Sequence, residues 1–145
     1  MGPFLNALAK LAAVPVGGVT SYPIEATPDA LTAAQLPALV IVPELGGASP
    51  GLEPNIFAAG EGMLLARVAH LLIVAPVAGG LGARSAFPVL AAAIDDYLAA
   101  LASDPLLDGA LRAALHVELR AGIVRYAGMD FHGATFTHTW RLHVD

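Results

Sequence analysis

The chain has 145 residues, the length of one ordinary domain and enough to bury roughly two thirds of the surface of the unfolded chain. It is 57% apolar and only 13% charged, so it has little charge with which to cover a free surface. The net charge of −5 argues against a nucleic-acid reader, which presents a basic face to phosphates, and the lack of cysteine excludes disulfides and thiolate chemistry. We therefore expect one domain, residues 1–145, that buries surface against protein partners as an obligate oligomer.

The first half of the chain predicts a helix followed by strands. Residues 3–13 predict a short amphipathic helix, whose apolar face consists of Phe4, Leu5, Leu8 and Leu11. Residues 19–29 alternate loosely and contain two prolines, which is typical of an edge strand or an extended arm. Residues 36–43 form a short apolar run bounded by prolines, which suits a buried strand. Residues 64–74 are apolar on both faces and are expected at the centre of the sheet.

The segment between these two strands, at about 44–62, is expected to be a long loop. It is rich in glycine, proline and acidic residues, and loops of this length in compact domains are usually functional or mobile. One interpretation is a connection without a role. The other is a segment that orders on a partner, with apolar anchors between acids. The candidate contact residues are Glu44, Glu53, Ile56, Phe57 and Glu61.

The second half predicts one long helix and a closing β-hairpin or meander. Ser85 is the expected N-cap, which places Pro88 in the first turn. The expected apolar stripe of this helix is Phe87, Leu90, Ile94, Tyr97, Leu98 and Leu101. Residues 115–120 then alternate with Leu115, Val117 and Leu119 facing inward, and a turn near Gly128 or Gly133 leads to the last strand. The fold class is therefore α+β, an antiparallel or mixed sheet packed against two main helices.

No membrane-spanning helix is expected from this pattern. The least charged stretch, between Arg67 and Arg84, is interrupted by His70, Pro76 and glycines. It is shorter than the roughly 18–20 unbroken apolar residues that a span needs. The sparse charge is therefore assigned to contacts between proteins.

Three of the five histidines lie in the last fifteen residues, FHGATFTHTWRLHVD, and raise the possibility of a metal site. Successive side chains of a strand point to opposite faces, so His138 and His143 face opposite ways, and a turn at Gly133 would separate His132 from both. Zinc needs three or four converging ligands. We therefore expect no metal at these residues, an exposed His143, and a His138 partly covered at an interface or at the edge of the core.

The remaining candidate sites also favour structural interpretations. The run GGLGARS, residues 79–85, has Ser85 where a dinucleotide-binding loop has its third glycine, which favours a flexible connection. Asp95 and Asp96 diverge by about 100° on a helix, and no serine lies in a G-x-S-x-G context. We expect no catalytic residues and no cofactor, so the chain is not expected to be an enzyme.

An N-terminal helix and three sequence stretches together cover most of the chain. The stretches are VTSYPIEATPDALTAAQLPALVIVP, the helix end YLAALASDPLLDG, and the closing IVRYAGMDFHGATFTHTWRLHV. Their layout resembles that of the tail terminator, or tail completion, proteins of long-tailed bacteriophages.

This resemblance implies a virion protein that forms a homo-oligomeric ring, commonly a hexamer, and caps the finished tail tube. It implies three partners besides other copies of the chain: the tail tube protein, the head-completion or neck protein, and DNA that passes through the lumen without specific binding. It also implies that the loop from Glu44 to Gly62 contacts the tube. The alternatives are another head–tail connector or minor tail protein, a small metal- or ligand-binding enzyme, and an oligomeric domain with an unrelated binding role.

Overall fold

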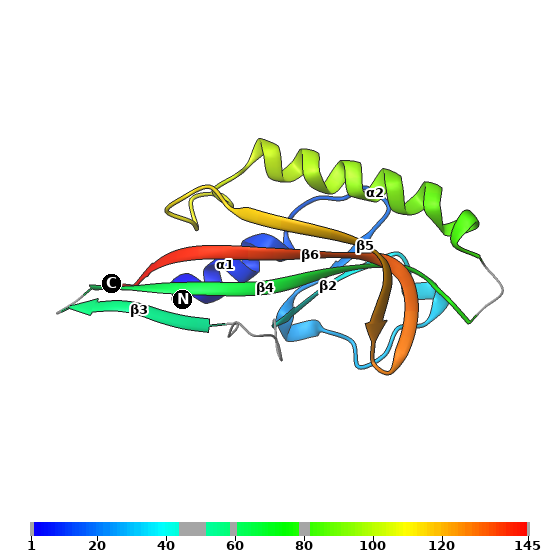
Figure 1. Ribbon diagram of the computed structural model, residues 1–145, viewed down its shortest axis with the longest axis horizontal. Coiled ribbons are helices and arrows are strands. Elements are labelled where there is room, and N and C mark those ends of the chain that lie inside the picture. Colours follow the sequence, from blue (N-terminus) through cyan, green and yellow to red (C-terminus); the bar gives the residue numbers. More distant parts are fainter. Residues whose placement is uncertain (1, 44–51, 59–60, 79–81, 145) are drawn as a thin grey trace.

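The computed structural model describes residues 2–43, 52–58, 61–78 and 82–144, and this part of the chain forms an α+β fold, as expected (Figure 1). In chain order the elements are α1 (Pro3–Ala12), β1 (Thr20–Tyr22), two 3₁₀ turns (Ile24–Ala26 and Ala33–Gln35), β2 (Ala38–Pro43), β3 (Leu52–Ala58), β4 (Glu61–Pro76), α2 (Ala83–Ser103), β5 (His116–Tyr126) and β6 (Met129–Val144).

The strands form one mixed sheet in the order β1-β2-β4-β6-β5, with β3 also paired to β4. Strand β4 lies at the centre, as its apolar sequence predicts. It pairs antiparallel with β6 along its whole length, from Gly62 to Pro76. On its other side it pairs with β3 through residues 61–66 and with β2 through residues 68–73, so β3 and β2 lie end to end (Figure 1). The short β1 is parallel to β2 and forms one edge, as the prolines around it predict.

The prediction of a long loop at 44–62 is wrong for the second part of that segment. Residues 52–58 form strand β3, which turns back as a hairpin onto the start of β4. The pairing register shifts between Pro54 and Ile56. Pro54 has no backbone N–H to donate to the neighbouring strand. Proline within a sheet is therefore found at edge strands and at irregularities such as this register shift. Glycine and proline on both sides made the segment resemble a loop, although LEPNIFA pairs with a long neighbouring strand.

Both helices cover the same face of the sheet, here called the helix face. Side chains of α1 and α2 pack with inward residues of β2, β4 and β6 in one apolar core, which includes Leu11, Tyr97, Leu72, Phe136 and Trp140. The opposite face is covered in part by residues 23–36, which contribute Leu31 and Leu36 to a second, smaller core. The rest of this opposite face, here called the open face, includes outward positions of β4, β5 and β6.

Helix α2 begins earlier than expected, and the stripe that it turns toward the sheet agrees with the prediction at Leu90, Tyr97 and Leu101 but not at Phe87 and Leu98. Its N-cap is Gly82, so Ser85 is inside the helix and Pro88 lies beyond the first turn. Phe87 is 66% exposed and Leu98 is also exposed, contrary to prediction. The buried stripe is Ala86, Leu90, Ala93, Tyr97 and Leu101. Alanines let the helix approach the sheet closely, whereas the prediction chose the larger apolar residues. In α1, likewise, Ala7 is buried and Leu5 is 52% exposed.

The chain reverses between β5 and β6 at Ala127 and Gly128, which both have positive φ angles, of 52° and 81°. This confirms the turn near Gly128 and rejects Gly133. The inward pattern expected for β5 is only partly correct, because Val117 is half-buried but Leu119 is exposed.

Gly133 is required for close approach of two strands rather than for a turn. It lies within β6 opposite Ile73, and a Cβ atom there would come within 2.0 Å of the Leu72 carbonyl oxygen. We expect Gly133→Ala to lower the free energy of unfolding by about 1–3 kcal/mol, because the central pair of strands must separate to admit the methyl group. Urea unfolding measures this. Gly17→Ala, where the added atom meets only an ordinary contact at 3.7 Å, is the control and should change stability by about 0.5 kcal/mol or less.

Candidate functional site

The closing strand has the two faces that its alternation predicts. Phe136, His138, Trp140 and Leu142 are buried on the helix face, whereas Arg141 is exposed on the open face. His138, however, is fully buried, so the expectation of a partly covered side chain at the edge of the core is wrong. The reason is α2, whose long buried stripe covers the middle of β6.

His138 belongs to a buried cluster with His70 and Tyr97. The three side chains come from β6, β4 and α2, and each residue is 0% exposed. The Tyr97 hydroxyl lies 2.8 Å from Nδ1 of His70 and 2.6 Å from Nε2 of His138. One phenol oxygen therefore bridges two imidazoles on neighbouring strands and joins the helix to the centre of the sheet.

The hydrogen bonds of this cluster constrain its protons. The single proton of the Tyr97 hydroxyl is donated to one imidazole, and the phenol oxygen accepts a hydrogen bond from the other. One imidazole therefore carries its proton on the nitrogen facing Tyr97 and the other carries it on the far nitrogen. The far nitrogens, Nε2 of His70 and Nδ1 of His138, are buried without a hydrogen-bond partner in the described part of the chain.

Burial keeps the cluster uncharged at neutral pH. Burial, with a contribution from nearby His138, lowers the pKa of His70 from 6.5 to about 3. Burial likewise lowers the pKa of His138 to about 4 and raises that of Tyr97 well above its usual value. Both imidazoles are neutral at pH 7. A base with so low a pKa, sealed from solvent, is poorly placed to exchange protons with a substrate.

Aromatic rings enclose the cluster. Phe136 stacks on Tyr97 with ring centroids 3.9 Å apart, and Trp140 meets His138 edge to face at 5.8 Å. Among the residues described, no group of three or more His, Cys, Asp or Glu side chains could hold a metal ion. The two imidazoles converge on the phenol oxygen rather than on an empty position. The arrangement therefore fixes how α2 sits on β4 and β6, and it offers no opening to a ligand.

The sequence interpretation missed His70 and the bridging role of Tyr97. A signal was available, because a histidine inside a strand that is apolar on both faces must be buried and needs a hydrogen-bond partner. Tyr97 lay in the predicted stripe of α2, on the face that meets that strand. The sequence alone does not show that β4, α2 and β6 pack together, and it is this packing that brings residues 70, 97 and 138 into contact.

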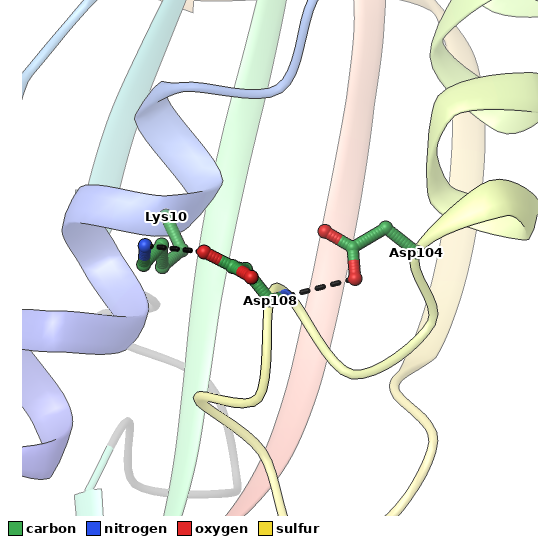
Figure 2. A network of polar contacts seen from close by, with 3 residues as sticks. All are labelled: Lys10, Asp104 and Asp108. Atoms are coloured by element: carbon green, nitrogen blue, oxygen red, sulfur yellow. Dashed lines mark hydrogen bonds and ion pairs between the residues drawn. The ribbon is translucent and has the colours of Figure 1, made fainter.

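A second polar group links the end of α2 to α1 at the surface. Nζ of Lys10 lies 2.6 Å from Oδ2 of Asp108, and Oδ1 of Asp104 accepts a hydrogen bond from the backbone N–H of Asp108 at 2.8 Å (Figure 2). Lys10 lowers the pKa of Asp108. Because Asp108 is exposed and Lys10 is partly exposed, solvent screens the pair, so this group connects two segments and contributes little stability.

The predicted partner-contact residues are brought together in part. Glu53, Ile56 and Phe57 lie on β3, and Glu61 begins β4, so four of the five belong to one hairpin rather than to a loop. Their side chains, and Glu44 altogether, lie outside the described residues. Of the predicted 79–85 connection, residues 79–81 are also outside the description, whereas Arg84 and Ser85 belong to α2.

The outer side of α2 is unusually apolar. By length and composition, α2 is the one helix in the described ranges that could cross a membrane. The core helix of a folded domain can have the same length and composition. Here one stripe of α2 packs on the sheet, whereas Asp95 and Asp96 are exposed. One side of α2 therefore packs on the sheet, and the exposed apolar side chains lie on the rest of its surface.

The geometry defines the class of the protein as a single-domain α+β fold with a mixed sheet and both helices on one face. No family model matches the chain, and no curated protein matches it.

Proposed function

We propose that this chain is the subunit of a phage tail terminator ring, which caps the tail tube and joins it to the head or neck. The proposal rests on the resemblance of the sequence pattern to that family. The structural observation that supports it most is the bare apolar surface of α2 and β5, because a ring subunit must bury such a surface against its neighbours.

This surface is made of large side chains on two elements. Phe87 and Leu98, which are eleven residues apart and therefore share one side of α2, are exposed, and so are Leu119 and the 60%-exposed Ile123 on β5. In the described part of the chain β5 pairs only with β6, so it is also an edge strand with unpaired backbone groups. Native proteins usually blunt or cover such edges, and burial in an interface is one way to do so.

The charge of the chain is compatible with a conduit for DNA. A net charge of −5 disfavours tight, non-specific binding to phosphates, so DNA could slide through a ring of such subunits. The sealed histidine cluster supports a structural role as well, since it organises the core without reaching the surface.

Native mass spectrometry of the purified chain tests the ring. We expect a closed oligomer, most simply a hexamer, alone or after addition of tail tubes. A chain that stays monomeric at high concentration and also on tubes would contradict the proposal. Metal analysis of the same sample tests the alternative of a metal enzyme, for which stoichiometric zinc, iron or manganese would be found.

The β3–β4 hairpin is the proposed contact with the tube. We expect Ile56→Ser combined with Phe57→Ser to leave the oligomer intact and to abolish capping, because two apolar anchors of the contact are lost. Electron microscopy of tube lengths with and without the protein measures capping. A matched control is Met129→Ser, at an exposed position at the start of β6, outside both the hairpin and the apolar surface of α2 and β5; this variant should still cap tubes. If the double variant caps normally, the hairpin is not the contact with the tube. If the wild-type chain binds neck proteins but never binds tubes, the chain is a connector instead.

A further inference from the structure

Strand β5 forms an edge of the sheet and is exposed on both of its faces. All six residues from Glu118 to Ile123 are exposed. In the described part of the chain β5 pairs only with β6, so every second residue directs its backbone N–H and C=O groups away from the sheet, where no strand meets them. The strand is eleven residues long and contains no proline, so it lacks two of the features that keep edge strands from pairing.

The inward residues of β5 continue the helix face beyond the area that α2 covers. The register with β6 places Val117, Leu119, Ala121 and Ile123 on the helix face. Phe136, which pairs with Leu119, is fully buried, whereas Leu119 and Ile123 are exposed. An apolar row on β5 is therefore bare, although it lies beside the buried row of β6.

One flank of α2 borders this bare row. The other flank, with Val89 and Asp96, lines a hollow together with Gly17, so it faces the segment that follows α1. Leu98 lies two residues after Asp96, which is about 200° around the helix, and Phe87 shares the side of Leu98. Both are exposed on the flank that faces away from the α1 side. The exposed apolar side chains of α2 thus lie on the same side of the molecule as those of β5.

The outward residues of β5 carry two opposite charges two positions apart. Glu118 and Arg120 lie on the open face, and both are exposed. Glu118 lies 3.8 Å from His116, and no ion pair of Arg120 is found among the described residues. Arg125, near the end of the strand, is 3.6 Å from Asp130 of β6. The exposed middle of the strand therefore carries one acid and one base, separated by a single residue.

This arrangement of charge is complementary to itself in one register. Two copies of β5 can pair antiparallel about a two-fold axis, and facing residues of antiparallel strands share a face, so the axis passes through one residue of each strand. An axis at Leu119 sets Glu118 of each copy opposite Arg120 of the other, which forms two ion pairs. An axis at Glu118 or at Arg120 sets two like charges directly opposite each other, which destabilises the pairing. Of these three registers, charge selects the axis at Leu119.

The same register is apolar along the helix face. The facing pairs on that face are Leu119 with Leu119, Val117 with Ala121, and Leu115 with Ile123. The paired range, residues 115–123, ends before Val124, where the second core begins to cover the open face. Continued beyond this range, the register sets Arg112 and Arg125 opposite uncharged positions. Charge and apolar pattern therefore favour one and the same alignment of two copies.

We propose that two copies of this chain pair through β5 in this register, about a two-fold axis at Leu119, so that their two sheets become one. The backbone ladder and the apolar row supply the contact, and the reciprocal ion pairs set the register. This contact goes beyond the function proposed above and does not rest on it. The pair buries the β5 surface, so it is the form of the free chain, and a ring that uses the same surface closes only after the pair separates.

Single cysteines test the register, because the chain contains no cysteine of its own. Leu119→Cys places two thiols on facing residues with Cα atoms about 4.5–5.5 Å apart, within the range of a disulfide. Ala121→Cys is the matched control, at another exposed position of the same face. Its two thiols lie four residues apart along the strands, roughly 13 Å, which is too far for a disulfide.

Oxidised glutathione supplies the oxidant, and non-reducing gels measure the covalent dimer. We expect Leu119→Cys to form the dimer at least tenfold faster than Ala121→Cys. Equal rates for the two variants, or no covalent dimer of Leu119→Cys, would overturn the register.

Charge reversal tests the ion pairs. Glu118→Arg and Arg120→Glu each replace both ion pairs with like charges, so each is expected to weaken pairing at least tenfold in sedimentation velocity. The double variant, Glu118→Arg with Arg120→Glu, exchanges the two charges and should pair like the wild type. An equimolar mixture of the two single variants should form mixed pairs, with one copy of each in native mass spectrometry. Asp95→Arg, on the outer side of α2, changes the net charge as Glu118→Arg does and should pair normally.

The outcomes separate this contact from other occupants of β5 and from the proposed function. A wild-type chain that is monomeric at high concentration, or single reversals that pair normally, would contradict the contact. If the wild type is monomeric and Glu118→Arg weakens only its binding to tail tubes, β5 takes a strand of another protein and the contact is overturned. If the wild type pairs as expected but never caps tubes, the contact stands and the function falls. If it caps tubes but neither pairs nor crosslinks, the function stands and the contact falls.

Discussion

Tyr97→Phe is expected to lower the free energy of unfolding by roughly 2–5 kcal/mol, although it removes a single oxygen atom. That oxygen is the hydrogen-bond partner of both His70 and His138, at 2.8 and 2.6 Å. Without it, two fully buried imidazoles each leave a polar nitrogen unsatisfied, at a cost of about 1–3 kcal/mol apiece. The surrounding rings of Phe136 and Trp140 leave the imidazoles enclosed in apolar surroundings.

Urea unfolding of the wild type and the variant at pH 7.5 measures this difference. Tyr22→Phe is the matched control, because Tyr22 is half-buried and no hydrogen bond of its hydroxyl is found among the described residues. It should change stability by about 0.5 kcal/mol or less. Equal effects of the two substitutions would show that the hydroxyl bridge is not a feature of the folded protein.

Stability is also expected to fall steeply as the pH drops below 6.5. The pKa values of His70 and His138 are lowered in the folded protein, to about 3 and about 4, from 6.5 when unfolded. Above pH 6.5 both histidines are neutral in both states and contribute no pH dependence. Between pH 6.5 and about 4 the unfolded chain binds more protons than the folded one, so the free energy of unfolding decreases. Each such proton is worth about 1.4 kcal/mol per pH unit, and the effect levels off below pH 3.

Chemical denaturation at a series of pH values from 7.5 to 4 measures this slope. The variant that isolates it replaces the whole cluster, His70→Leu, Tyr97→Phe and His138→Leu, and thereby leaves no polar group of the cluster unpaired. We expect this triple variant to have a much flatter profile in the same range, since an apolar replacement of a buried polar network is often tolerated. The carboxylates, including Asp108 with its lowered pKa, titrate in both proteins and cancel in the comparison. Parallel profiles would mean that the histidines are accessible to protons in the folded state.

The two predictions concern the same structural role. A buried network in which each partner depends on one hydroxyl makes the position of α2 on the sheet specific, because a shifted helix would leave His70 and His138 unsatisfied. If α2 carries one side of the contact between subunits, its position on the sheet sets the geometry of that contact. Acid conditions would then weaken assembly and folding together.

The sequence by itself determined the class of the fold and the broad placement of most elements. A run that is apolar on both faces, residues 64–74, has to be covered on two sides, and it lies at the centre of the sheet. The alternation in residues 134–144 correctly assigned the two faces of β6, since that pattern depends only on the geometry of a single strand. The same alternation correctly separated His138 from His143, whereas the sequence leaves the turn open between Gly128 and Gly133 and the structure places it at Ala127 and Gly128.

Tertiary structure alone decided the features that depend on distant partners. Segment 52–58 is a strand because β4 is long enough to pair with it, although its composition is that of a loop. Alanines rather than Phe87 and Leu98 face the sheet, because a helix that lies close to a sheet needs small side chains at the contact. The cluster of His70, Tyr97 and His138 joins residues that are 27 and 41 positions apart, and no local periodicity brings them together. Local pattern fixes which way a side chain points, whereas its partner is set by which elements pack against one another.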